Sequence, residues 1–333
     1  MKIKHKQILK FFLFVLILIT LNQFFTHIYV NNIMGKSKYM RKLKAFESLP
    51  TKKLKHLVLG FSHTNQAINP EALENSFNFA LPSANYIQIY YQMKYIFENM
   101  KMEIKNIYLS FEYLIFGIDK EKTMRNHYFW RKYVNYYEAG RKMNAVSRYL
   151  KYWFHGTFFP YVGESAILYQ YLQTSQTVIY NRKMYRGFYF FKGIKFSANN
   201  KQNQKRMSIQ RAKFQYSLFH TLYYQPIIDY FYKMVELCKK HEVRLILVRT
   251  PLHEEYVNQI KKSIKNFSDH KEKLMNVINI ASKKYNQFFY FDLSKEFFGK
   301  PHLFTDPNHL NYEGSLAFTK ILKEKMNLLN NKN

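Results

Sequence analysis

The sequence has almost no cysteine, and this limits how the chain is held together. Its 333 residues include a single cysteine, Cys238, so no disulfide can form within the chain. That cysteine stands in "KMVELCKKHEV", an amphipathic helical pattern in which it is interpreted as a small buried apolar residue. No residues have the spacing of a metal site. The sequence therefore predicts neither a disulfide nor a metal or other cofactor.

Acidic residues are also few. The 22 Asp and Glu stand against 52 Lys and Arg, a formal net charge of +30 at pH 7. Such a charge is typical of proteins that meet nucleic acid or an anionic surface. Lys, Asn, Ile, Tyr and Phe, the residues of AT-rich codons, are all heavily used, so genome composition explains the charge as well. The alternative explanation is a basic surface that binds an anionic polymer or lipid head groups. Nucleic acid is disfavoured, because no binding module or aromatic and basic repeat is present.

The N-terminus, "MKIKHKQILKFFLFVLILITLNQFFTHIYV", has no charged residue between Phe11 and Val30. About 20 such residues can cross the hydrocarbon core of a bilayer as a helix. No small-x-small cleavage pattern and no lipobox cysteine follow. We therefore predict a cytoplasmic N-terminus (1–10), an uncleaved transmembrane signal anchor (11–30) and a basic linker (31–54), with the rest of the chain extracytoplasmic at the cell membrane. The alternative is an apolar helix within the domain core.

After the linker, short apolar runs alternate with longer amphipathic ones, which is typical of βα units around a parallel sheet. Predicted strands are 56–61, 77–81, 104–111, 244–250 and 288–293, and predicted helices are 86–100, 225–243, 267–285 and 311–329. We predict one α/β domain over 55–330. The stretch of about 117–214 shows no regular period of apolar residues and is rich in aromatic and basic side chains. We interpret it as a largely helical insertion. Its aromatic side chains either form a small core or stack on sugar rings.

Candidate catalytic residues stand at the two ends of this domain. Functional groups gather beyond the carboxyl ends of parallel strands, and Ser62 in "HLVLGFSHTN" follows the first strand directly. A serine in this place is either a helix cap or a nucleophile, and a nucleophile needs a histidine held by a carboxylate. "HLFTDPNHLNYEG" supplies Asp306 and His309, three residues apart in a loop before the last helix. The three residues are therefore a candidate Ser-His-Asp triad.

The blocks "GFSH" and "DPNHLNYEG" resemble those of the SGNH/GDSL hydrolase superfamily in type, order and position. "INPEALENSFNFALPSANYIQIYYQMKYI" and "RLILVRTPLHEEY" are similar to its membrane-anchored branch, which includes the D-alanine transfer protein DltD. The resemblance covers about half of the chain. It implies a three-layer, flavodoxin-like α/β fold with a central parallel sheet.

The resemblance also implies roles for individual residues. Ser62 is then the nucleophile, His309 the general base and Asp306 the acid that orients it, with the Ser62 backbone N–H as an oxyanion donor. Ser83 occupies the place of the second-block glycine. The third block, "LSFEY", has no asparagine, so Asn85 or Asn78 is a candidate substitute. His63 and His253 are further candidates for substrate contact, with local packing or helix capping as the alternative for each.

The implied function is a serine esterase or O-acyltransferase acting on an acylated, anionic cell-envelope glycan. A membrane-bound acyltransferase is a candidate partner. Because the third-block asparagine is missing, a non-catalytic partner protein of an envelope-polymer modification system is the alternative. A third reading is a basic, membrane-bound binder of anionic lipid or nucleic acid.

Overall fold

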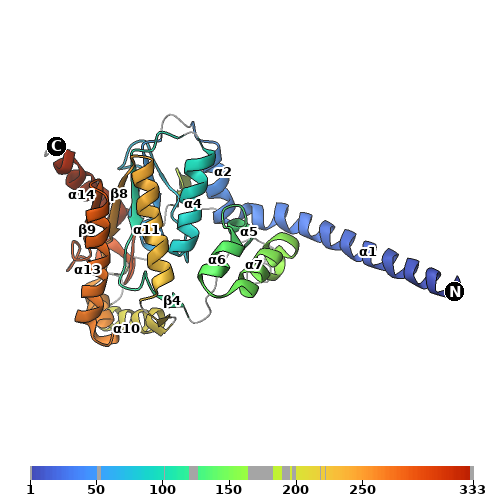
Figure 1. The fold of residues 1–333 in the computed structure, drawn as a ribbon. Helices are drawn as coiled ribbons and strands as arrows, with labels where there is room; N and C mark the ends of the chain where they lie inside the picture. The colour runs from blue at the N-terminus through green and yellow to red at the C-terminus, as the bar shows by residue number, and fades with distance from the viewer. Residues whose placement is uncertain are drawn as a thin grey trace. The chain divides into compact units, whose positions relative to one another are not determined.

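The computed structural model (Figure 1) describes residues 2–50, 54–100, 102–119, 127–163, 183–189, 196, 200–217, 219–221 and 223–330. It divides into two compact units. One, here called the anchor unit, comprises Met1–Leu43 and Met124–Asn181. The other, the sheet unit, comprises Lys44–Thr123 and Arg182–Asn333. Much of the predicted insertion, including residues 164–182, lies outside the described residues.

The sheet unit is built on five parallel strands in the order β2-β1-β3-β8-β9. In chain order this is 2-1-3-4-5, the doubly wound order of flavodoxin-like folds. The register pairs Val58 with Tyr108 and Tyr108 with Ile246. The strands are β1 (His56–Leu59), β2 (Ser76–Asn78), β3 (Asn106–Ser110), β8 (Arg244–Arg249) and β9 (Phe288–Asp292).

Helices cover both faces of this sheet, so the predicted three-layer α/β fold is confirmed. On one face lie α4 (Tyr86–Asn99), α11 (Gln225–Lys240) and α13 (Phe267–Lys284), seen in front of the strands in Figure 1. Tyr86 of α4 stacks on Phe231 of α11, with ring centroids 5.7 Å apart. On the other face, α3 (Ser62–Ala67) and α14 (Tyr312–Asn330) share an apolar core with β1, β3 and β8. Both layers bury the amphipathic faces that the sequence pattern indicated.

Each of the five predicted strands occurs, and each is shorter than its apolar run. Three short antiparallel strand pairs among the described residues were not predicted: β4 (Ile118–Asp119) with β7 (Phe219–Thr221), β5 (Met184–Tyr185) with β6 (Phe188–Tyr189), and β10 (Phe304–Asp306) with β11 (His309–Leu310). Two- and three-residue strands are too short to show a period, so no sequence pattern announces them. The sheet unit also contains α10 (Lys201–Ser217), α12 (Glu254–Ser263) and the 3₁₀ turn η4 (Pro301–Leu303), and α2 (Lys38–Glu47) runs across the unit boundary.

The anchor unit begins with the long helix α1 (Lys2–Asn32), which is followed by the 3₁₀ turn η1 (Met34–Lys36). Residues His5–Lys36 are long and apolar enough to cross a membrane, and the most apolar stretch within them is not buried. Four further helices complete the described part of the unit: α5 (His127–Trp130), α6 (Tyr136–Lys142), α7 (Val146–Phe158) and α8 (Pro160–Gly163). Their core is aromatic, with Phe129 and Trp130 buried and their ring centroids 4.9 Å apart.

Candidate active site

Gly60 turns the chain from β1 into the helix that carries Ser62. Its φ of +128° is in the region that favours glycine, and a Cβ at this position would lie 2.0 Å from Ser110 Oγ. Ser110 also accepts a hydrogen bond of 3.1 Å from the Phe61 backbone N–H. Ser62 is then the first residue of α3 and is partly exposed. In the Gly-x-Ser sequence, the glycine therefore makes the turn at the carboxyl end of β1, and the serine begins the helix that follows.

Asp306 and His309 face each other across the β10–β11 hairpin. They form an antiparallel pair, and Pro307 and Asn308 make the two-residue turn between them. His309 Nδ1 lies 2.8 Å from Asp306 Oδ2, and Asp306 Oδ1 accepts a hydrogen bond of 3.0 Å from the Asn308 backbone N–H. A spacing of three residues thus brings the two side chains into contact within one tight hairpin.

Burial and the hairpin contacts set the charges of this pair. Burial lowers the pKa of His309 below its ordinary value and outweighs the support that Asp306 gives to the charged form. Burial opposes ionisation of Asp306, but the contacts with His309 and the Asn308 N–H, together with the positive charge of Arg211, bring the pKa of Asp306 below its usual range. We conclude that His309 is neutral with Nδ1–H donating to the carboxylate. Its Nε2 is buried and has no hydrogen-bond partner within the part of the chain that the structure describes, so it can accept a proton.

The helix that begins at Ser62 packs beside the strand that carries this base. Helix α3 packs against β11, and the ring of His63, the next residue, lies 5.3 Å from the His309 ring between centroids. Among the hydrogen bonds of the described residues, none joins Ser62 to His309. The structure therefore places the serine's helix beside the base, and the hydroxyl–imidazole bond of a working triad is not formed here.

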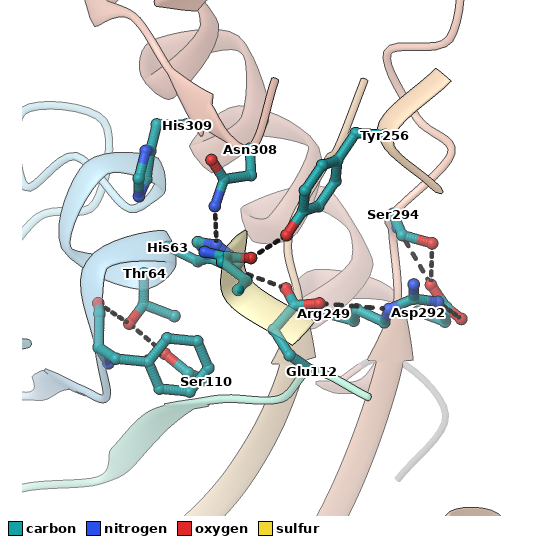
Figure 2. Close-up of polar contacts among 12 residues, drawn as sticks. His63, Thr64, Ser110, Glu112, Arg249, Tyr256, Asp292, Ser294, Asn308 and His309 are labelled. Atoms are coloured by element: carbon teal, nitrogen blue, oxygen red, sulfur yellow. Dashed lines mark hydrogen bonds and ion pairs between the residues drawn. The ribbon is translucent and has the colours of Figure 1, made fainter. Parts of the chain in front are cut away.

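His63 is buried, and both of its ring nitrogens are engaged (Figure 2). Nδ1 lies 2.8 Å from Glu112 Oε1, and Nε2 lies 2.8 Å from Asn308 Nδ2. Asn308 Oδ1 accepts a hydrogen bond of 3.0 Å from Arg211 Nε, which orients the amide so that its NH₂ group donates to His63. His63 Nε2 is therefore an acceptor, and the proton of the neutral ring is on Nδ1, toward Glu112.

The contacts continue from Glu112 across the ends of β8 and β9 (Figure 2). Arg249 Nε lies 3.7 Å from Glu112 Oε2, and Arg249 Nη1 donates to Asp292 Oδ2 at 3.0 Å. The guanidinium also stacks over the ring of Tyr113 at 3.8 Å. Burial disfavours the charged guanidinium, but Glu112 and Asp292 raise the pKa of Arg249 above its ordinary value. A buried polar network thus links the carboxyl ends of β3, β8 and β9 to α3 and the hairpin.

The remaining predicted residues have mostly local roles. Asn85 caps α4 in a reciprocal capping box with Gln88, and buried Asn78 donates to backbone carbonyls of α3 and its C-cap. Ser83 is exposed with a φ of +62°. The ring of His253 packs against Phe196, while its backbone N–H donates to the Pro307 carbonyl at 2.9 Å. Within the described part of the chain, no hydrogen bond or ion pair joins Asn85, Asn78 or Ser83 to the hairpin.

Several polar residues of the network were not among the predicted site residues, although the sequence contained a signal for two of them. Arg249 is charged inside the apolar strand run "RLILVRT", and Glu112 follows β3 where the third-block asparagine was sought. A buried charge of this kind needs a partner, which the sequence does not identify. Arg211 and Asn308 gave no signal. Among the described residues, no group of three or more His, Cys, Asp or Glu side chains could hold a metal ion.

Comparisons with known proteins show distant similarity. A structure described as a putative acylhydrolase, from Bacteroides fragilis NCTC 9343, is 11% identical with a TM-score of 0.37, over 87% of this chain and 96% of that one. Another, described as a putative platelet activating factor, from Streptococcus pneumonia, is 10% identical with a TM-score of 0.36, over 91% of this chain and 98% of that one. A family model without a descriptive name matches residues 165–330. No curated protein matches the sequence. At these similarities, no activity or residue role is transferred to this chain.

Proposed function

We propose that this chain is a membrane-anchored serine esterase or O-acyltransferase of the SGNH/GDSL type, acting on an acylated polysaccharide of the cell envelope. The observation that carries the proposal is the His309–Asp306 pair, which keeps a neutral imidazole with an unpartnered Nε2 beside the helix that begins at Ser62. This is the arrangement that activates a serine hydroxyl. The anchor and the basic composition favour an anionic envelope glycan as substrate.

In the proposed mechanism, Ser62 Oγ attacks the ester carbonyl while His309 Nε2 takes the hydroxyl proton. Asp306 holds the ring and stabilises the imidazolium that forms. The tetrahedral intermediate then collapses, and His309 returns the proton to the leaving alcohol. Water or a sugar hydroxyl attacks the acyl-serine in the second half of the reaction. Because free enzymes often hold catalytic hydrogen bonds open until substrate binds, a rotation of Ser62 toward Nε2 on binding is part of the proposal.

A non-catalytic role in an envelope-polymer system is the second candidate, and one observation favours it. Glu112 stands where the superfamily resemblance calls for an oxyanion-stabilising asparagine, and its carboxylate is engaged with His63. Loss of one oxyanion donor costs roughly 3 kcal/mol of transition-state stabilisation. Such a protein would keep the fold and lose turnover.

One experiment separates the two candidates. The full-length protein in detergent is given a chromogenic acetyl ester and, separately, a fluorophosphonate probe that modifies activated serines. For an enzyme we expect labelling at Ser62, and Ser62→Ala should lower kcat on the order of 10⁶-fold. The matched control is Ser263→Ala, which removes a partly buried hydroxyl that bonds only within its own helix, α12, and should leave turnover and labelling unchanged. Equal turnover by wild type and Ser62→Ala, with no labelling, would leave the binding role.

A further inference from the structure

Helix α7 of the anchor unit carries an apolar stripe on its outer side. It buries Tyr149, Tyr152 and Gly156 within its own unit. The opposite side exposes four large apolar side chains, between 36% and 45% of each: Leu150, Trp153, Phe154 and Phe158. Their spacing of i, i+3, i+4 and i+8 places them on one helical face. Contiguous exposed apolar surface of this kind marks a site of interaction with a partner or a membrane.

The carboxyl end of α7 is hydrogen-bonded to the apolar helix α1. Asn22 Nδ2 donates to the Phe158 carbonyl at 3.0 Å, and Thr26 Oγ1 donates to the same oxygen at 3.4 Å. The Tyr161 hydroxyl in α8 donates to Asn22 Oδ1 at 2.6 Å. The last carbonyls of a helix have no partner within it, so these side chains of α1 satisfy an otherwise open acceptor. The polar residues of α1 on this side therefore fix α7 against it.

The position of these bonds along α1 determines their depth in a membrane. Lys10 is the last charged residue before the apolar run, and Asn22 follows it by about 18 Å along the helix axis and Thr26 by about 24 Å, at 1.5 Å per residue. The hydrocarbon core of a bilayer is about 30 Å thick. If Lys10 marks one edge of that core, the end of α7 meets α1 at the level of the opposite leaflet.

We infer that α7 is a second membrane contact, lying in the bilayer interface beside α1 with its apolar stripe in lipid. Three observations select lipid as the occupant. The stripe reaches the depth of the opposite leaflet through Asn22 and Thr26. The neighbouring helix α1 is itself apolar and exposed, with Phe24 and Phe25 59% and 58% exposed. Exposed Arg148 and Lys151 also lie on α7, where they can meet anionic head groups.

The two tryptophans of the chain provide the test. Trp130 is 1% exposed, whereas Trp153 lies in the stripe. Full-length protein is reconstituted into vesicles of phosphatidylcholine and phosphatidylglycerol, with bromine on the acyl chains near the head groups as a quencher. We expect severalfold quenching of the Trp153 emission, and little quenching in Trp153→Phe, which retains only Trp130. Phe154→Ser combined with Phe158→Ser should weaken the quenching, whereas Tyr137→Ser, an exposed aromatic of α6, should not.

A second variant reports whether α1 itself is inserted. Ile19→Trp in the Trp153→Phe background places an exposed tryptophan about 14 Å beyond Lys10 along the helix, near the middle of the hydrocarbon core, where bromine near the chain ends should quench it. Quenching of this tryptophan without quenching of Trp153 would overturn the inference and assign the stripe to a protein partner or a second copy. Quenching of neither would overturn it too, because α1 would then not set the depth of α7.

Discussion

At the scale of single residues, the hairpin pair determines what His309 can do. Nδ1 donates to Asp306, and the buried Nε2 has no hydrogen-bond partner among the described residues. Burial lowers the pKa of His309, so the ring stays neutral at a lower pH than an exposed histidine would. A neutral ring with this tautomer is the form that a general base requires.

The first prediction concerns this pair. Activity requires neutral His309, so it should be present above the His309 pKa and lost as pH falls through it. Because the pKa lies below the ordinary 6.5, the acidic limb of kcat/KM for ester hydrolysis should lie below pH 6.5. Asp306→Asn lets an amide occupy the place of the carboxylate and favours the wrong tautomer, which should lower kcat about 10³- to 10⁴-fold. An acidic limb above 6.5, or an Asp306→Asn variant of wild-type rate, would contradict this account.

At the scale of elements, His63 joins α3 to the β10–β11 hairpin. It follows Ser62 directly, and its Nε2 accepts from Asn308, which lies between Asp306 and His309 in the chain. One hydrogen bond thus connects the helix of the nucleophile to the turn that carries the base, across 245 positions of sequence. Glu112 holds the other ring nitrogen and so keeps Nε2 as the acceptor. His63 is therefore a positioning residue in the proposed enzyme.

The second prediction compares two substitutions of His63. Glutamine offers an N–H to Glu112 and an oxygen to Asn308. Leucine instead leaves Glu112 Oε1 and Asn308 Nδ2 buried without their His63 partner, at a cost of about 3 kcal/mol in folding free energy. We expect His63→Gln to retain much of kcat and His63→Leu to lose it, with KM changed less than kcat. Ester hydrolysis and thermal unfolding are measured for both variants. Equal kcat values in two folded variants would argue against positioning through Asn308.

At the scale of the whole molecule, the basic composition affects stability at the amino edge of the sheet. His56, Asn106 and Arg244 begin β1, β3 and β8 and lie in register. They line a cavity of about 280 Å³ together with Lys323 of α14. Burial, and then the positive charges of Arg244, Lys323 and Lys105, lower the pKa of His56 to about 4. The folded protein therefore opposes protonation of this histidine.

The third prediction follows from that shift. The folded pKa of about 4 is below the unfolded value of 6.5, so the contribution of His56 is complete above pH 6.5 and is lost progressively as pH falls toward 4. The loss amounts to roughly 3 kcal/mol at most. His56→Gln should make the unfolding temperature less sensitive to pH in this window, as followed by circular dichroism. Parallel curves for wild type and variant would rule out this role of His56.

The succession of strands and helices along the chain and the local chemistry of the two motifs are properties of nearby residues, and for that reason they could be predicted. Apolar periodicity indicated the α/β fold, Gly60 and Ser62 indicated the turn after β1, and a spacing of three indicated the Asp306–His309 pair. The turn and the pair depend on contacts between residues close in sequence, and the fold class depends on repeated βα units. The roles proposed for Ser83, Asn85 and His253 stay predictions, and so does the substrate.

The buried network and the exposed stripe of α7 required the folded chain. Glu112, Arg249 and Asn308 come from separate segments, and only the meeting of strand ends with the hairpin gives each charge and amide its partner. The pattern of α7 shows an apolar face but not whether that face points to the core or outward. Long-range packing decides both, because a side chain's partner and its burial depend on residues far away in the sequence.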